Sequence, residues 1–201
     1  MITLYDYELS GSCYKVRLFL HFLDLPYDTI PVDFVEGEHK RELLMSLNPF
    51  GELPVLQDGD LVLRDAQAIL TYLALKYDVS NTWYPDDAAK RGLISQWLAT
   101  GGGELMSVSG ARLAKALRYP FDLDKLHTAA HRAFRILNAH LERRQFLALD
   151  HPTIGDIACF PYTALANEAG LDISDYPHLL AWTLRMRSLP RFFAMPGIAG
   201  L

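Results

Sequence analysis

The sequence predicts an α/β domain followed by an all-helical domain, and two observations lead to this fold class. Strand-like and helix-like segments alternate up to about residue 78, whereas only helical patterns follow it. Half of the 201 residues are hydrophobic and 21% are charged, which is enough apolar surface for a substantial packed core. We therefore expect an α/β domain over residues 1–78, a linker over 79–87 and a helical domain over 88–201.

The first half of the chain reads as a βαβ unit followed by a ββα unit. In order, we expect a strand over 2–7, a helix over 14–23, a strand over 27–34, a helix over 40–47, two strands over 53–57 and 61–63, and a helix over 66–77. Proline or asparagine-proline breaks separate the early elements, as at Asn48-Pro49. The last two strands form a hairpin, because Gly59 supplies the positive φ that its turn requires.

The second half carries long helical patterns without strand signals. Helices are expected over 88–117, 123–149, 154–169 and 178–188. The second of them repeats apolar residues every three or four positions, which is typical of a helix with one buried face. Gly101-Gly102-Gly103 falls inside the first, where three glycines cost about 2–3 kcal/mol relative to alanine. A bend or a close backbone approach is expected there.

Composition argues against several classes of protein. A net charge of −5 with scattered basic residues gives no support to nucleic-acid binding. Charged residues interrupt the longest apolar run, so no membrane span is expected, and the first residues are unlike a secretory signal. Cys13 and Cys159 cannot supply a disulfide framework, and His127 and His131 lack a third metal ligand. We expect a soluble cytoplasmic protein with no metal.

The first candidate site is Ser10-Gly11-Ser12-Cys13, where the first expected strand leads into the first helix. Backbone N–H groups at a helix start have no partner and carry the positive end of the helix dipole, which favours a thiolate. The thiolate would belong either to the protein or to a bound ligand. Alternatively, Ser10 or Ser12 only caps the helix.

Two further segments each have a structural and a functional interpretation. Pro54 opens a strand that belongs inside a small sheet, which suggests a bend and a cis peptide after Leu53. A cis bond would leave the Leu53 backbone free to pair with a peptide-like ligand, whereas a trans proline would simply begin the strand. Asp65 opens the third helix, either as a capping carboxylate or as a partner for the ammonium of an amino-acid ligand.

Together these segments resemble the glutathione transferase superfamily over essentially the whole chain. Ser10-x-Ser-x-x-Lys-Val-Arg17, Asn48-Pro49-x-Gly51-x-Leu-Pro54-Val-Leu56 and Asp65-x-Gln67-Ala-Ile69 occur in the family's order and spacing, and Thr153-Ile154-Gly155-Asp156 resembles its buried capping box. The resemblance implies the glutathione transferase fold. In that fold a thioredoxin-like N-terminal domain binds glutathione, and an all-helical domain contributes a hydrophobic acceptor site.

The resemblance also implies roles at the start of the first helix. Ser10 matches the serine that hydrogen-bonds the glutathione sulfur in serine-type members such as the theta and zeta classes. Ser12 falls where some bacterial relatives have an asparagine that contacts the same sulfur. Cys13 occupies the place of the second cysteine in the Cys-x-x-Cys pair of thioredoxin-like proteins, and dithiol exchange is absent because Ser10 replaces the first. Which of the three contacts the sulfur stays open.

The remaining glutathione contacts are implied in the same way. His39 matches a histidine near the glycine end, Leu53 pairs its backbone with the cysteinyl part ahead of a cis Pro54, and Asp65 faces the γ-glutamyl ammonium. Gln67 follows in the same motif. Ala66 departs from the family, which usually has a serine that binds the γ-glutamyl carboxylate. Its backbone N–H remains at the helix start, and we expect glutathione binding to be weaker by about 1–2 kcal/mol.

The implied function is that of a cytoplasmic, homodimeric glutathione transferase in detoxification, with glutathione as co-substrate. It would activate the bound thiol as a thiolate for attack on a small hydrophobic electrophile. Trp97, Met106 and Tyr119 are candidates for the acceptor site, with a core or interface role as the alternative for each. Other readings are a glutathione-dependent peroxidase or disulfide reductase, a zeta-like isomerase, or a non-catalytic binding or scaffold protein, which Ala66 favours.

Overall fold

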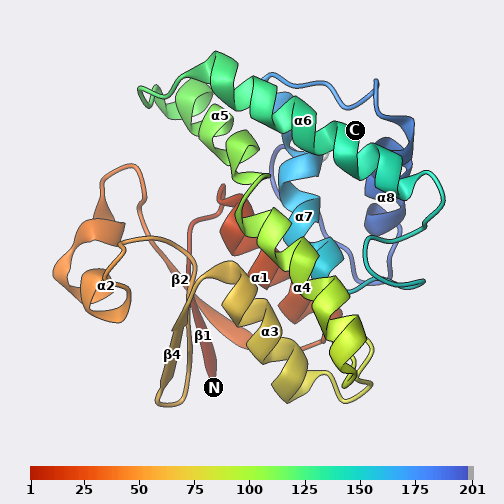
Figure 1. The fold of residues 1–201 in the computed structure, drawn as a ribbon. Helices are drawn as coiled ribbons and strands as arrows, with labels where there is room; N and C mark the ends of the chain where they lie inside the picture. Colours follow the sequence, from red (N-terminus) through yellow and green to blue (C-terminus); the bar gives the residue numbers. More distant parts are fainter. Residues whose placement is uncertain (199–201) are drawn as a thin grey trace.

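The computed structural model describes residues 1–198 and contains the two expected units, a mixed sheet with helices and a group of helices (Figure 1). The first unit consists of β1 (Ile2–Asp6), α1 (Gly11–Phe22), β2 (Tyr27–Pro31), a 3₁₀ turn (Glu38–Lys40), α2 (Glu42–Leu47), β3 (Val55–Asp58), β4 (Leu61–Arg64) and α3 (Ala66–Tyr77). The second consists of α4 (Ala88–Gly102), α5 (Met106–Leu117), α6 (Leu123–Leu141), α7 (Ile154–Ala164), a 3₁₀ turn (Ala166–Ala169) and α8 (Pro177–Arg187). Residues 199–201 of the expected helical domain lie outside the described residues.

The sheet has the strand order β2-β1-β3-β4, with β1 parallel to β2 and antiparallel to β3. Because side chains alternate along a strand, its two faces carry different cores. Leu4 and Leu56 join the large core that includes α1 and α3, whereas Tyr5 and Val55 pack with Leu44 of α2 on the other face. The α2 segment therefore lies on the side of the sheet away from the helical unit (Figure 1).

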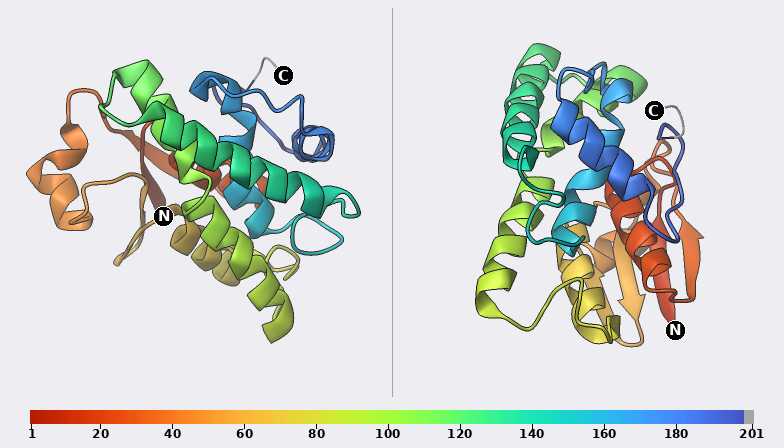
Figure 2. Two further views of the ribbon diagram at one scale, coloured as in Figure 1. Left: turned by 45° about the horizontal axis from the view of Figure 1, so that its top comes forward. Right: turned by 90° about the vertical axis from the view of Figure 1, so that its right-hand side faces the viewer.

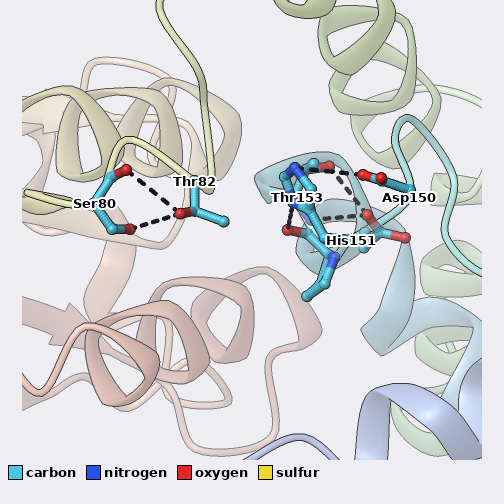
Figure 3. A network of polar contacts seen from close by, with 7 residues as sticks. Ser80, Thr82, Asp150, His151 and Thr153 are labelled. Carbon is cyan, nitrogen blue, oxygen red and sulfur yellow. Dashed lines mark hydrogen bonds and ion pairs between the residues drawn. The ribbon is translucent and has the colours of Figure 1, made fainter.

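The α7 helix forms the centre of the molecule. All eleven of its residues are buried, and it packs against α1, α3, α4, α5 and α8. The predicted capping box is present at its start. The Thr153 side chain accepts from a backbone N–H of the first turn, and the Asp156 carboxylate accepts from the Thr153 N–H. Figure 3 shows Thr153 with Asp150 and His151 just before α7, and Ser80 and Thr82 in the linker. The linker is bound to this end, since Ile154 N–H donates to Trp83 O at 3.1 Å.

The glycine triplet produces both of the features expected for it. The prediction of one helix over 88–117 is wrong in its continuity, because α4 ends at Gly102 and α5 begins three residues after Gly103. A Cβ at Gly101 would lie 2.6 Å from Ala158 O in α7, so the glycine permits a close approach of two helices. A Cβ at Gly102 would lie 2.2 Å from the Gln67 amide nitrogen.

Other boundaries also differ from the sequence prediction. The helix expected over 123–149 ends at Leu141, because the following chain turns back and Leu147 N–H donates to the buried Asp156 carboxylate at 2.8 Å. The helix expected over 154–169 changes to a 3₁₀ turn after Leu165 and stops before Gly170, whose φ is 78°. The α1 helix begins at Gly11, three residues earlier than expected, and β2 ends three residues early at Pro31.

Polar contacts join the ends of several elements. Asp58, at the end of β3, accepts hydrogen bonds from the hydroxyls of Tyr72 and Tyr77 and from Lys76, all in α3. These donors lower the pKa of Asp58 to about 2, with the Tyr77 hydroxyl as the largest cause. The carboxylate therefore remains charged well into the acid range and joins the hairpin to α3.

The chain after α8 returns along α1 (Figure 2). The buried Tyr14 hydroxyl donates to Phe193 O, and Arg191 forms an ion pair with Asp24 at 2.9 Å. This segment therefore joins the helical unit to the sheet unit on the side of α1. Within residues 1–198, none of the helices combines the length and the apolar character that crossing a bilayer requires.

Candidate functional site

A cleft of about 860 Å³ lies between the two units, with walls from both. The sheet unit contributes the start of α1, the residues before β3 and the start of α3, and the helical unit contributes α5 and part of α7. Ten of the predicted site residues line this cleft: Ser10, Ser12, His39, Leu53, Pro54, Asp65, Ala66, Gln67, Met106 and Tyr119. Cys13 and Trp97 do not line it.

Ser10 caps α1 at the floor of the cleft. Its backbone is extended, with φ −78° and ψ 120°, and its Oγ accepts the N–H of Cys13 at 3.2 Å. This bond uses a lone pair of the hydroxyl, so its proton remains available to an acceptor in the cleft. The N–H groups of Gly11 and Ser12 have no acceptor within residues 1–198. The helix start therefore offers a hydroxyl proton, two N–H groups and the positive end of a dipole to an anion.

Ser12 is held by a residue from the other unit. Its Oγ lies 2.9 Å from the hydroxyl of Tyr162, which comes from the last turn of α7. The Tyr162 ring lies against Gly11, where a Cβ would be only 2.7 Å from a ring carbon. Burial raises the pKa of Tyr162, so the phenol keeps its proton at neutral pH. Tyr162 lies in a buried, mostly apolar helix and belongs to none of the motifs in the sequence, so the sequence analysis missed it.

Cys13 lies behind this surface and not on it. The side chain is fully buried, and burial, together with the nearby Asp6 carboxylate, raises the pKa of the thiol to about 12. The thiol is therefore protonated at neutral pH and does not reach the cleft. The structure brings Ser10 and Ser12 together at the start of α1 and separates Cys13 from them.

The Leu53–Pro54 peptide bond is cis, the alternative that the family resemblance implied and that the residues alone left open beside trans. Among residues 1–198, the Leu53 N–H and C=O form no backbone hydrogen bond. Pro54 is buried and Leu53 is half-buried, and both line the cleft. An extended peptide lying here would find one backbone donor and one acceptor free to pair with it.

His39 lies at the end of the cleft formed by the chain between β2 and α2. Its ring stacks on Phe34 with centroids 4.2 Å apart, and Phe34 stacks on Tyr7 at 5.4 Å. The side chain is 7% exposed, and within the described residues its Nδ1 has no hydrogen-bond partner. Burial is the larger cause that lowers the pKa of His39, followed by the neighbouring Lys40 charge, so the imidazole is neutral at pH 7.

The start of α3 is organised by Asp65. Its Oδ1 accepts from the N–H groups of Gln67 at 2.9 Å and Ala68 at 3.0 Å, which is the capping role. Its backbone has φ 71° and ψ 123°, a conformation that is rare for a residue with a Cβ and that is concentrated at functional sites. The Ala66 N–H has no acceptor within residues 1–198, and Ala66 is among the residues that line the cleft. The turn therefore combines a carboxylate and an unpaired N–H.

Lys15 lies beneath this turn and is fully buried. Its ammonium donates to Gly101 O at 2.8 Å and lies 3.4 Å from Gln67 Oε1, so it joins α1 to both α3 and α4. Burial is the main cause that lowers the pKa of Lys15 to about 8. The sequence analysis quoted Lys15 within a motif but gave it no role.

The opposite wall of the cleft is mostly apolar. Met106 contributes from the first residue of α5 and Tyr119 from the chain just after its last residue, Leu117, and the stacked rings of Tyr7 and Phe34 line the same cleft. A polar floor between them includes Arg112, which forms an ion pair with Glu168 at 2.6 Å. This half of the cleft suits an apolar ligand.

Trp97 belongs to a different region, which corrects the expectation for it. Its ring packs on His140 of α6 with centroids 4.6 Å apart, and its Cβ lies at the position that a Cβ on Gly155 would approach within 3.0 Å. Trp97 therefore supports the contact between α4, α6 and α7. Within residues 1–198, no group of three or more histidine, cysteine, aspartate or glutamate side chains is arranged to hold a metal ion.

Comparisons with known proteins give one consistent result. The family model "Glutathione S-transferase, N-terminal domain" matches residues 1–75, and "Glutathione S-transferase, C-terminal domain" matches residues 121–190. The chain is 31% identical over 179 residues to glutathione S-transferase F9 of Arabidopsis thaliana, which covers 82% of each chain.

Solved structures agree over nearly the full length. A glutathione S-transferase from Pseudomonas fluorescens has a TM-score of 0.90 at 31% identity, covering 97% of this chain and 98% of its own. A glutathione transferase homolog from Lodderomyces elongisporus, solved with two GSH per subunit, has a TM-score of 0.87 at 25% identity over 94% of each chain.

Proposed function

The chain belongs to the glutathione S-transferase superfamily, and from this we propose that it activates the thiol of bound glutathione for attack on a small hydrophobic electrophile. Relatives from Arabidopsis thaliana, Zea mays and Homo sapiens are named glutathione S-transferases. Glutathione acts as a co-substrate, and the apolar half of the cleft receives the electrophile.

We propose that glutathione lies along the sheet-unit wall of the cleft. The γ-glutamyl ammonium faces Asp65, and its carboxylate approaches the unpaired Ala66 N–H, with Gln67 beside them. The cysteinyl backbone pairs with the free N–H and C=O of Leu53. The glycine end lies near His39, and the sulfur reaches the start of α1.

One observation carries the proposed mechanism: the Ser10 hydroxyl caps α1 and keeps its proton for an acceptor in the cleft. A free thiol has a pKa of about 8.5 and is mostly protonated at neutral pH. A hydrogen bond from Ser10, with the positive end of α1 behind it, stabilises the thiolate and lowers that pKa. The thiolate then attacks the electrophile without a dedicated base.

Ser10→Ala tests this mechanism. We expect kcat/KM for conjugation to fall by about 10²–10³, the usual effect of removing one donor to a developing or bound anion. The glutathione dissociation constant should change by no more than about threefold, because Ser10 contacts only the sulfur. Ser188→Ala is the matched control, since it removes a serine hydroxyl at the end of α8, outside the cleft. Unchanged turnover in Ser10→Ala would rule out this role.

Ala66 is the feature that supports a non-catalytic binding or scaffold protein instead, because it lacks the usual hydroxyl. Titration calorimetry with glutathione distinguishes the two readings, since a lost site would give no heat at millimolar ligand. In the enzyme, Ala66→Ser should tighten glutathione binding by about five- to thirtyfold, because it adds a hydrogen bond worth about 1–2 kcal/mol. A panel of chloro-nitroaromatic, hydroperoxide and maleyl substrates separates conjugation from peroxide reduction and isomerisation.

We also propose that the chain works in the cytoplasm as a homodimer, in detoxification of electrophiles. Exposed apolar side chains on β4 and α3 support an association surface, with Leu61 40% and Leu75 56% exposed beside a shallow apolar depression. Sedimentation equilibrium measures the mass in solution. Leu75→Lys should shift a dimer toward monomer, and a wild-type mass of one chain would refute the proposal.

A further inference from the structure

Tyr162 belongs to the helical unit, but its hydroxyl lies at the start of α1 in the sheet unit. The Tyr162 side chain is almost completely buried, and the residue lines the cleft. Its hydroxyl oxygen lies 2.9 Å from Ser12 Oγ. Two hydroxyls, one from each unit, therefore form a hydrogen-bonded pair beside the cleft: Tyr162 and Ser12.

The protons of these two hydroxyls restrict which of them donates and which accepts. Each hydroxyl has one proton to donate and lone pairs to accept. A thiolate bound in the cleft can only accept, so it takes the Ser12 proton and leaves the phenol proton of Tyr162 for Ser12 Oγ. Ser12 then accepts, and its own proton points to the remaining acceptor direction. That direction is the cleft, because Ser12 is half-buried and the N–H groups at the helix start around it are donors.

We infer that Tyr162 is a positioning residue for thiol activation: it donates to Ser12 Oγ and so directs the Ser12 hydroxyl proton at the glutathione sulfur, beside Ser10. This inference rests on the proposed function. It adds a second hydroxyl donor to the sulfur site, and it makes the orientation of that donor depend on α7 of the helical unit. Glutathione bound in the sheet unit would thereby be activated fully only with the helical unit in contact.

The neighbours of Tyr162 keep the phenol neutral and fixed. The ammonium of Lys15 in α1 lies 4.8 Å from the centre of its ring, Arg112 of α5 also contributes a positive charge, and the Cys13 thiol lies nearby. Burial raises the pKa of the phenol more than the neighbouring serine side chains and the Arg112 charge lower it, so the proton is retained at neutral pH. Tyr162→Phe keeps the ring that contacts Lys15 and Gly11 and removes only the hydroxyl.

The experiment is a pH titration of the bound glutathione thiolate by its ultraviolet absorbance, combined with kinetics. In Tyr162→Phe we expect the pKa of the bound thiol to rise by about half a unit to one unit, because one hydrogen bond to the anion loses its orientation. At neutral pH kcat/KM should fall by about three- to tenfold, while the glutathione dissociation constant stays within about twofold.

Coupling between the two residues distinguishes positioning from a general structural role. Ser12→Ala should give the same shift as Tyr162→Phe, and the double variant should add nothing further, because both changes remove one interaction. Ser12→Thr keeps the hydroxyl and should keep the wild-type pKa. Tyr14→Phe is the matched control, since it also removes a buried tyrosine hydroxyl, bonded to Phe193 O, and should leave the pKa of the bound thiol unchanged.

Two results would overturn the inference: a wild-type thiol pKa in Tyr162→Phe, or shifts from Ser12→Ala and Tyr162→Phe that add. If Tyr162→Phe does not fold by circular dichroism, Ser12→Ala alone decides, and a wild-type pKa in that variant overturns the inference. A loss of thiolate in Ser10→Ala with no effect in the other two refutes only the inference. No bound thiolate in the wild type refutes the proposed function as well.

Discussion

Replacing the buried Lys15 with methionine removes a cation and keeps an unbranched side chain that is one atom shorter. At neutral pH the effect on stability combines two opposing changes. Gly101 O and Gln67 Oε1 lose their donor, which destabilises the fold, whereas a charge no longer has to be buried, which stabilises it. The net change at one pH therefore says little. The dependence of the change on pH is the informative quantity.

The expected magnitude follows from the pKa. Burial lowers the pKa of Lys15 from its ordinary 10.5 to about 8. Between these values the unfolded chain keeps the proton and the folded chain has lost it, so the unfolded state binds more protons. The free energy of unfolding then rises with pH across this window. At 1.36 kcal/mol for each pH unit, the free energy of unfolding of the wild type rises by about 3 kcal/mol relative to Lys15→Met between pH 8 and pH 10.5.

Denaturant unfolding at a series of pH values between about 7 and 10.5 measures this difference. Subtracting the variant from the wild type cancels the other groups that titrate in the same range. Lys90→Met, which removes an exposed lysine of α4, is the matched control and should follow the wild type at every pH. A difference between wild type and Lys15→Met that stays constant over the window would show that Lys15 is not desolvated as the structure has it.

Three further predictions concern other parts of the molecule. Gly101→Ala should destabilise the fold by about 1–3 kcal/mol, because the new Cβ would meet Ala158 O. Gly92→Ala in the same helix has open space for its Cβ and should stabilise the fold by about 0.5–1 kcal/mol. Thermal unfolding measures both changes. Asp58→Asn should lower the free energy of unfolding above about pH 4, because it removes a carboxylate that stabilises the fold in its charged form. This stabilisation disappears in the wild type as the pH falls through the Asp58 pKa of about 2, so the two proteins should converge there. Acid unfolding curves measure the difference. Tyr119→Ala should raise KM for a hydrophobic electrophile by about threefold or more, with KM for glutathione unchanged, and equal effects on both would place it outside the acceptor site.

Local signals in the sequence were sufficient for most of the fold. The hairpin turn at Gly59 and the α3 helix follow directly from turn chemistry and apolar periodicity, and the structure confirms both. The errors occur where a tertiary contact overrides the local pattern. The chain after Leu141 continues a helical pattern, but the buried Asp156 carboxylate binds the Leu147 N–H and turns the chain back. No local signal reports such a contact.

The site divides in the same way. Motif residues such as Ser10, Leu53 and Asp65 could be found from spacing, because each lies at an element boundary that sequence marks. Tyr162 and Lys15 could not, because each lies inside an apolar helix, where a single polar atom does not alter the periodicity. Trp97 was predicted for the site but lies outside it. Sequence periodicity does not distinguish an aromatic residue that faces the cleft from one that faces a neighbouring helix.

A weaker signal for these two hidden residues exists in the glycines around them. A Cβ at Gly11 would lie 2.7 Å from the Tyr162 ring, and one at Gly102 would lie 2.2 Å from the Gln67 amide that adjoins Lys15. Gly11 is the first residue of α1 and Gly102 is the last residue of α4. Both lie where the two units meet, at positions with no room for a Cβ. Because any side chain at position 11 would displace Tyr162 from Ser12, the residue at that position determines whether the helical unit can reach the start of α1.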